Sequence, residues 1–157
     1  MPMRPGVGSA TPFAESSPAS STAVSVILVG GGKAQLSKPA VARDLYVSPQ
    51  FAQRRARAEA SGVPWFVVSG RWGLLHPDDL LAPYSFSFAQ QSLNYRRAWG
   101  RFVAEQLCLF SSVGRGDVVE ICAGAAYTSA LTAPIGYLGA LIRRETAGAS
   151  DSGDEPR

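Results

Sequence analysis

Two acidic residues stand where a carboxylate could take part in chemistry. Asp44, Tyr46 and Ser48 are spaced two apart, so in an extended segment a carboxylate, a phenol and a hydroxyl would project to one side. Glu120 interrupts the apolar run DVVEIC at residues 117–122, where a carboxylate is costly unless it is paired or faces a cleft. Asp44 and Glu120 are therefore the candidate catalytic residues.

Each of these residues also has a structural interpretation. Ser48 followed by Pro49 is typical of a helix start, so the Ser48 hydroxyl is expected to cap that helix, with Tyr46 packing as its hydrophobic neighbour. Asp44 could instead form an ion pair with Arg43 or Arg71. Glu120 could lie on an edge strand that faces water.

Three glycine-rich segments follow apolar runs, at residues 30–33, 69–73 and 120–127. Ligands of open α/β sheets bind at the carboxyl ends of the strands, so these segments are expected to form a binding site. Backbone N–H groups near Gly31 and the Lys33 ammonium could hold an anion there, although a glycine-rich turn with an exposed lysine explains the same residues. The pattern lacks the residues of a Walker A loop, which argues against a P-loop NTPase.

The sequence predicts the strands and helices that carry these segments. Strands are expected at residues 24–29, 63–69 and 117–122, helices at 49–61, 95–110 and 135–143, and an irregular loop at 74–86. Strands that alternate with helices predict a small three-layer α/β/α domain with a mainly parallel sheet of about four strands.

The ends of the chain differ in composition from its centre. Residues 1–22 are rich in Pro, Ser, Ala and Gly, and residues 145–157 are polar and acidic, so both are expected to be disordered around a single α/β domain at residues 23–144. That domain has thirteen basic and seven acidic residues, a net charge of +6, which favours an anionic partner such as a nucleotide or nucleic acid. A solvated basic surface is the alternative.

The two cysteines indicate the cellular compartment and whether a metal is bound. Cys108 and Cys122 stand in apolar surroundings with no partner at metal-ligand spacing, so we expect two buried, reduced thiols, a cytoplasmic protein, and no metal or other cofactor. The sequence contains no segment that is long and apolar enough to span a membrane. It does not predict the oligomeric state.

Four motifs in order resemble a known family. Residues 26–33 are an apolar run followed by GGGK, residues 42–51 read ARDLYVSPQF, residues 65–84 include WFVVSGRWGLLHPDD and PY, and a Trp-containing helix follows. This order resembles the domain-of-unknown-function family 6884, which is distantly similar to YaaA-like proteins, and the resemblance covers residues 26 to about 144. It implies a fold similar to that of uracil-DNA glycosylases and a base, nucleotide or nucleic acid as ligand.

The departures from the family fall in the glycine-rich loops. The family usually has a cysteine where this chain has Gly31, a second lysine or similar residue where it has Gln35, and S-A-K-[HY]-G at residues 69–73. The absence of the cysteine rules out a mechanism that needs a thiolate at this position. Trp72 suggests a different or specialised ligand.

We expect an N-glycosidase-type enzyme that acts on a nucleoside, nucleotide or nucleic-acid base. The oxocarbenium-like transition state of such a reaction needs a nearby carboxylate, which Asp44 or Glu120 would supply. The other candidates bind the substrate: Trp72 and Tyr84 stack the base, Lys33 and Arg71 hold phosphate, Tyr46 or Tyr127 orients the sugar, and Gly31, Ser48 and Ser69 lie in the same loops.

The alternative is a non-catalytic nucleic-acid-binding protein. Its arginines would follow a phosphate backbone while aromatic rings stack bases. Two groups of arginines suit this role, Arg54, Arg55 and Arg57 in one predicted helix and Arg96, Arg97 and Arg101 in another. Both groups could also be solvated helix faces. The convergence of polar residues on the strand ends favours the enzyme.

Overall fold

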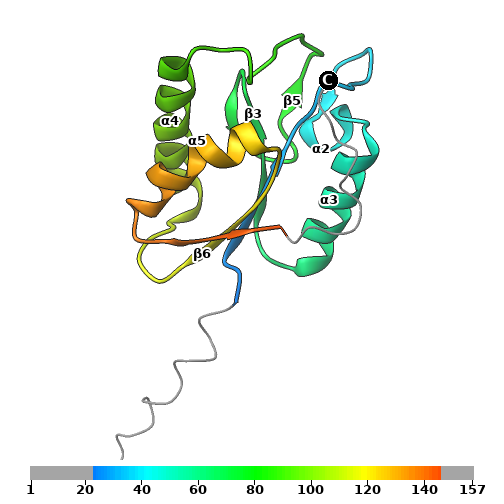
Figure 1. The fold of residues 1–157 in the computed structure, drawn as a ribbon. Coiled ribbons are helices and arrows are strands. Elements are labelled where there is room, and N and C mark those ends of the chain that lie inside the picture. Colours follow the sequence, from blue (N-terminus) through cyan, green and yellow to red (C-terminus); the bar gives the residue numbers. More distant parts are fainter. Residues whose placement is uncertain (1–22, 146–157) are drawn as a thin grey trace, which may run out of the picture.

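The computed structural model describes residues 23–145, and its centre is a five-stranded sheet in the order β4-β3-β1-β6-β7 (Figure 1). The strands are β1 (Val26–Gly30), β3 (Trp65–Ser69), β4 (Gly73–Leu75), β6 (Val118–Cys122) and β7 (Leu141–Arg144). β1, β3, β6 and β7 run parallel, whereas β4 returns antiparallel beside β3. The α/β class and the mainly parallel sheet are confirmed, with five strands where about four were predicted.

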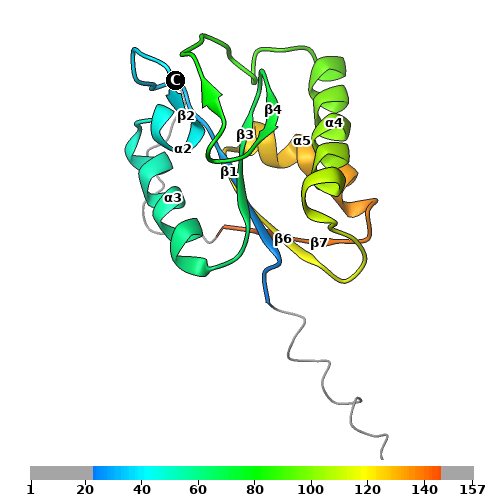
Figure 2. The same ribbon diagram turned by 180° about the vertical axis from the view of Figure 1, so that it is seen from behind.

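Helices cover both faces of this sheet (Figures 1 and 2). The short α2 (Ala42–Leu45) and α3 (Pro49–Ser61) lie on one face, and α4 (Leu93–Ser111) and α5 (Ala125–Gly136) lie on the other. A second, two-stranded antiparallel sheet pairs β2 (Ala40–Val41) with β5 (Leu80–Leu81) beside α2.

The strands are buried because their side chains alternate between two apolar cores. In β1, Val26 and Leu28 belong to the core beneath α4 and α5, whereas Ile27 and Val29 belong to the core beneath α2 and α3. All residues of β1 and β6 are buried, as expected for parallel strands that are covered on both faces. A register shift of one residue would exchange the side chains between the two cores, so the packing of both cores holds the strand ends in place.

The prediction for α3 is confirmed at both ends. The Oγ of Ser48 accepts a hydrogen bond from the N–H of Phe51 at 3.1 Å, and Pro49 lies in the first turn. Gly62 ends the helix with a φ of 77°, a left-handed conformation that glycine adopts without a steric cost. Ser48 is therefore a helix cap, the structural role that its sequence position suggested.

The prediction for the C-terminal region was wrong. A helix was expected at residues 135–143, but α5 ends at Gly136, and the edge strand β7 pairs with β6. The residues of α5 are mostly small and gave no apolar periodicity, although alanine has the highest helix propensity. The expected irregular loop at 74–86 also contains part of β4 and all of β5. Both errors concern short strands, whose pairing depends on tertiary contacts.

The structure describes little of the two chain ends that the sequence predicted to be disordered. The predicted N-terminal arm, residues 1–22, and most of the predicted tail, residues 146–157, lie outside the described residues. Glu145, the first residue of that tail, is described and accepts hydrogen bonds from Arg54.

Cys122 is buried as expected, but Cys108 is exposed on the solvent side of α4. Within residues 23–145, no helix is both long and apolar enough to cross a membrane.

Candidate functional site

The carboxyl ends of β3, β1 and β6 lie side by side, because these strands are parallel neighbours in the sheet. The chain continues from them into residues 70–72, 31–33 and 123–127, the glycine-rich segments that the sequence singled out. We call this edge of the sheet the strand-end site. Its position matches the general location of ligand sites in open parallel sheets.

A chain of three hydroxyl groups crosses the strand-end site. The Oη atoms of Tyr46 and Tyr84 are 2.6 Å apart, and the Oγ of Ser69 lies 2.8 Å from the Oη of Tyr84. The same Oγ accepts hydrogen bonds from the backbone N–H groups of Arg71 at 3.2 Å and Trp72 at 3.0 Å. Ser69 therefore fixes the turn after β3, and two phenols link it to the chain before α3.

A second set of aromatic residues holds the backbone of Gly70. Its N–H donates to the Oη of Tyr127 at 3.0 Å, and its carbonyl oxygen accepts from the Oη of Tyr95 at 2.8 Å. The indole N–H of Trp99 donates to the carbonyl oxygen of Ser69 at 2.9 Å. Tyr127 comes from α5, while Tyr95 and Trp99 come from α4, so both helices are fastened to this turn.

The sequence predicted a helix at residues 95–110, which contains Tyr95 and Trp99, but it gave neither residue a role in the site. The available signal was their chemistry, because the polar tip of a largely buried tyrosine or tryptophan usually finds a hydrogen-bond partner. The partners here are backbone carbonyl groups some 25 and 30 residues earlier in the chain. Such partners carry no side-chain signature, which is why the pattern did not identify them.

Two glycines are required because aromatic rings fill the space above them. A Cβ atom on Gly31 would lie 2.6 Å from the Cζ of Tyr46, and one on Gly70 would lie 2.8 Å from the Cβ of Phe88. Real Cβ atoms essentially never approach other atoms this closely. The floor of the strand-end site is therefore packed with rings.

The phenols of this floor remain neutral at ordinary pH. Burial, followed by the neighbouring Tyr84, raises the pKa of Tyr46 above its ordinary value. Burial raises the pKa of Tyr127 to about 12. Both groups therefore serve as neutral hydrogen-bond donors and acceptors and not as bases.

The rim of the strand-end site is exposed and basic. Lys33 and Arg71 are exposed, and the ring of Trp72 is 46% exposed with the guanidinium of Arg71 at 4.7 Å from its centroid. The N-cap of α5, Gly124, provides no side-chain hydrogen bond, and a Cβ there would meet nothing within 4 Å. The first N–H groups of α5 are thus accessible at the same edge, where they favour an anion.

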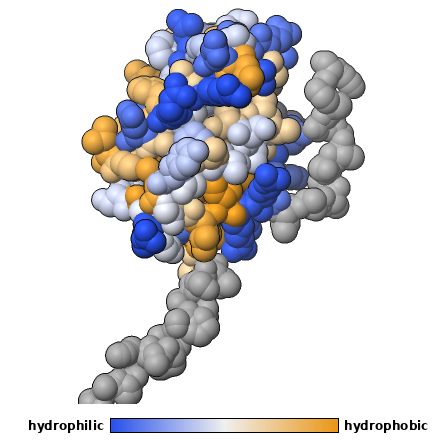
Figure 3. Space-filling view, turned by 60° about the vertical axis from the view of Figure 1, so that its left-hand side comes forward, coloured by the Kyte–Doolittle hydropathy of each residue, from blue (hydrophilic) through white to orange (hydrophobic). Residues whose placement is uncertain are grey.

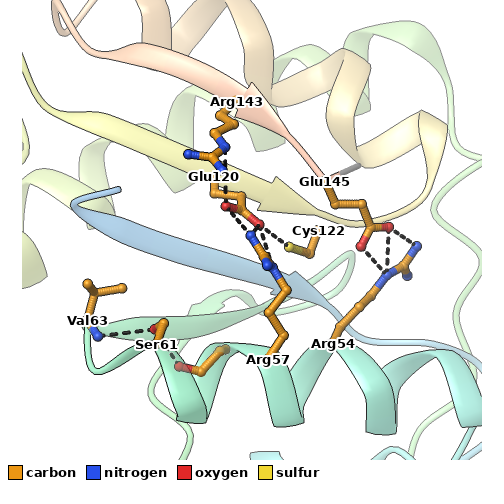
Figure 4. A network of polar contacts seen from close by, with 9 residues as sticks. Arg54, Arg57, Ser61, Val63, Glu120, Cys122, Arg143 and Glu145 are labelled. Carbon is orange, nitrogen blue, oxygen red and sulfur yellow. Dashed lines mark hydrogen bonds and ion pairs between the residues drawn. The ribbon is translucent and has the colours of Figure 1, made fainter. Parts of the chain in front are cut away.

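Glu120 lies away from this rim, in the middle of β6. Its carboxylate is fully buried and accepts hydrogen bonds from the Nε of Arg57 at 2.9 Å and the Nη2 at 2.7 Å (Figure 4). The guanidinium of Arg143 lies 3.7 Å away, and the Sγ of Cys122 donates at 3.3 Å. The sequence left open whether a buried Glu120 would be paired or would face a cleft. In the structure its carboxylate is paired with Arg57.

Asp44 also points elsewhere. It belongs to α2, and its carboxylate accepts a hydrogen bond at 2.9 Å from Arg55 of α3. The expected common side for Asp44, Tyr46 and Ser48 does not form, because the segment is helical at Asp44 instead of extended. Tyr46 packs against Gly31, and Ser48 caps α3.

Metal ligands do not cluster in the part of the chain that the structure describes. There, no group of three or more His, Cys, Asp or Glu side chains could hold a metal ion. The side chains that the strand-end site offers are phenols, hydroxyls, an indole and basic groups.

The comparisons with known proteins identify a family. Residues 26–150 match DUF6884, a family of unknown function, which covers most of the chain. No curated protein matches the chain. The chain therefore belongs to the DUF6884 family.

Proposed function

We propose that this protein binds a nucleotide, free or within a nucleic acid, at the strand-end site and does not cleave its glycosidic bond. The observation that carries the proposal is the exposed indole of Trp72, which lies beside Arg71 on the rim of three converging strand ends. An aromatic face next to cationic groups suits a ligand that has a flat base and a phosphate.

The base would stack on Trp72. The turn that carries this indole is fixed by the Oγ of Ser69, which accepts from the N–H of Trp72 itself. Because this hydrogen bond holds the backbone N–H of Trp72, the backbone of the turn loses little freedom when a ligand binds. Stacking of a base on an aromatic side chain contributes about 1–3 kcal/mol.

The phosphate would lie against the basic rim. Lys33 and Arg71 supply the charges, and the accessible N-terminus of α5 supplies backbone N–H groups. The phenols of Tyr46 and Tyr84 would accept or donate hydrogen bonds to the sugar or base edge.

The binding function is favoured over the N-glycosidase because of where the carboxylates lie. An oxocarbenium-like transition state needs a carboxylate close to the sugar. Both sequence candidates are held by arginines of α3, Glu120 by Arg57 and Asp44 by Arg55. Neutral phenols do not replace a carboxylate in that role.

The finer sequence expectations belong to the same proposal. We infer a three-layer α/β/α arrangement similar to that of YaaA-like proteins and uracil-DNA glycosylases, a likeness that implies a base, nucleotide or nucleic acid as ligand. We also infer a cytoplasmic location, which suits two free thiols, Cys108 and Cys122, and a nucleotide ligand.

Calorimetric titration with a panel of bases, nucleosides and nucleotides tests the proposal. We expect at least one nucleotide to bind, and Trp72→Ala to weaken it by roughly tenfold through lost stacking. Leu109→Ala is the control, because Leu109 is 80% exposed on α4 and lies outside the strand-end site. Equal affinity of the Trp72→Ala protein, or no binding by any nucleotide, contradicts the proposal. If chromatography of the protein after incubation with a nucleotide shows released free base, the proposal that the protein does not cleave the glycosidic bond is contradicted.

A further inference from the structure

A groove lies between α4 and α5, with a cavity volume of about 430 Å³. Its walls include Arg97 and Arg101 from α4, and Ala130 and Pro134 from α5. This volume is within the range of roughly 300–1,000 Å³ that is usual for ligand sites. Figure 3 shows the side of the molecule that carries α4 and α5, where strongly hydrophilic residues lie next to hydrophobic ones.

The groove has a rigid base because the two helices touch. A Cβ atom on Gly100 of α4 would lie 2.2 Å from the carbonyl oxygen of Ala130 on α5, so only glycine allows this approach. Both helices are also fastened to the strand-end site, since Tyr95 and Tyr127 bond to the same residue, Gly70. Arg96 and Ala126, which line the groove, are the chain neighbours of these two tyrosines, so one end of the groove lies near Gly70.

The groove is positively charged and its charges are not neutralised. Arg97 and Arg101 are exposed and stand one helical turn apart, where like charges repel each other. Arg96 also lines the groove and donates to the carbonyl oxygen of Gln91 at 3.2 Å. Among the described residues, no carboxylate lines the groove and none pairs with Arg97 or Arg101. An anionic ligand would remove this repulsion.

The groove also offers apolar and aromatic surface. Tyr137 lines it and is 88% exposed, and Leu93 at the start of α4 is 52% exposed. A duplex presents mainly phosphates to a protein surface, whereas a single strand presents phosphates together with unstacked bases. The combination of arginines with an exposed phenol and apolar walls therefore matches a single strand.

We propose that the α4–α5 groove binds single-stranded nucleic acid, which continues from the nucleotide held at Trp72. This inference rests on the proposed function and extends it from a nucleotide to a strand. Arg97 and Arg101 contact successive phosphates, and the ring of Tyr137 stacks on a base.

Fluorescence anisotropy with a labelled thymidine oligonucleotide, measured across a range of salt concentrations, tests the proposal. We expect Arg97→Gln and Arg101→Gln each to reduce the slope of log K against log salt by about 0.7, the value for one lost phosphate contact on a single strand. Glutamine keeps a high helix propensity, so α4 should be retained. Arg54→Gln is the control, because Arg54 lies on α3, on the other face of the sheet, and pairs with Glu145.

A second variant separates stacking from charge. Tyr137→Ala is expected to weaken oligonucleotide binding by roughly tenfold while leaving the salt slope unchanged. Circular dichroism melting of every variant identifies any loss of folding.

The outcomes distinguish this proposal from the one on which it rests. Oligonucleotide binding that is unchanged in the combined Arg97→Gln and Arg101→Gln protein overturns the groove proposal, even if single nucleotides still bind at Trp72. Equal affinity for a duplex or for an acidic peptide overturns it as well. Oligonucleotide binding that depends on the groove, together with no binding of any single nucleotide, overturns the proposed function instead.

Discussion

Two helices on opposite faces of the sheet carry similar groups of arginines, but the arginines have different partners. On α3, Arg54 bonds to Glu145 at 2.7 Å and Arg57 holds the buried Glu120 (Figure 4). On α4, Arg97 and Arg101 face a groove in which none of the described residues is acidic. The arginines of α3 are therefore part of the fold, whereas those of α4 are available to a ligand.

The difference shows what an arginine pattern alone can indicate. The partners of Arg54 and Arg57 lie 91 and 63 positions away in the chain. A sequence pattern therefore cannot separate a paired group from an unpaired one. Only the sheet order, which brings β6 and β7 next to α3, makes the distinction.

The largest expected effect concerns the α3 side. Arg57→Ala leaves the carboxylate of Glu120 buried without its bidentate partner, with the guanidinium of Arg143 at 3.7 Å and the Sγ of Cys122 at 3.3 Å as neighbours. Removal of one member of a buried pair costs about 3–5 kcal/mol, and we expect a loss of about 3 kcal/mol in the free energy of unfolding in urea.

Two matched variants make this prediction sharper. Arg54→Ala removes a partly exposed pair, which is worth about 0–1 kcal/mol, and Arg97→Ala removes an arginine that has no carboxylate partner among the described residues. If Arg97→Ala destabilises the protein as much as Arg57→Ala, the contrast between the two helices is wrong.

The next effect concerns the α4–α5 side, which is held by close packing. Gly100→Ala places a Cβ against the carbonyl oxygen of Ala130, and overpacking of this kind costs roughly 1–3 kcal/mol. Gly136→Ala in α5 meets nothing within 4 Å, so we expect it to be neutral or to stabilise the helix by up to about 1 kcal/mol. Urea unfolding of both proteins measures this, and equal stability would show that the helices do not touch at Gly100.

A further effect appears only at alkaline pH, on both sides of the sheet. Burial and the charge of Glu120 raise the pKa of Cys122 from 9.0 to about 12, and burial raises that of Tyr127 from 10.0 to about 12. The unfolded chain loses these protons first, so stability is complete below pH 9 and falls as the pH rises toward 12. For each group, the free energy of unfolding falls by up to about 1.4 kcal/mol per pH unit in this range.

Single substitutions show which part of the pH dependence of stability comes from Cys122 and which from Tyr127. Cys122→Ala should flatten the stability curve from pH 9 upward, and Tyr127→Phe should flatten it only above pH 10. Urea unfolding at a series of pH values gives both curves. Curves that coincide with that of the unsubstituted protein would mean that neither group is buried in its neutral form.

The sequence was a good guide where local chemistry decides the structure. Ser48, Pro49 and Gly62 predicted the bounds of α3, and continuous apolar runs predicted β1, β3 and β6. The strand ends came together as expected because parallel strands end at the same edge. β7 was missed because pairing with β6 outweighs the weak preference of its own residues.

The candidate site was predictable only in part. Ser69, Tyr46, Tyr84 and Tyr127 do converge, because they follow strands or pack over glycines. The direction of a carboxylate was not predictable, because it depends on partners that are far away in the sequence. Glu120 therefore appeared to be a candidate catalyst, although Arg57 accounts for its burial.

The central claim is that the arginines of α4 bind a nucleic-acid strand while those of α3 stabilise the fold. The most direct test compares Arg97→Gln with Arg54→Gln in the salt-dependent anisotropy of a thymidine oligonucleotide. We predict that Arg97→Gln lowers the salt slope by about 0.7 and that Arg54→Gln leaves it unchanged. Equal slopes for the two variants, or a larger loss with Arg54→Gln, would contradict the claim.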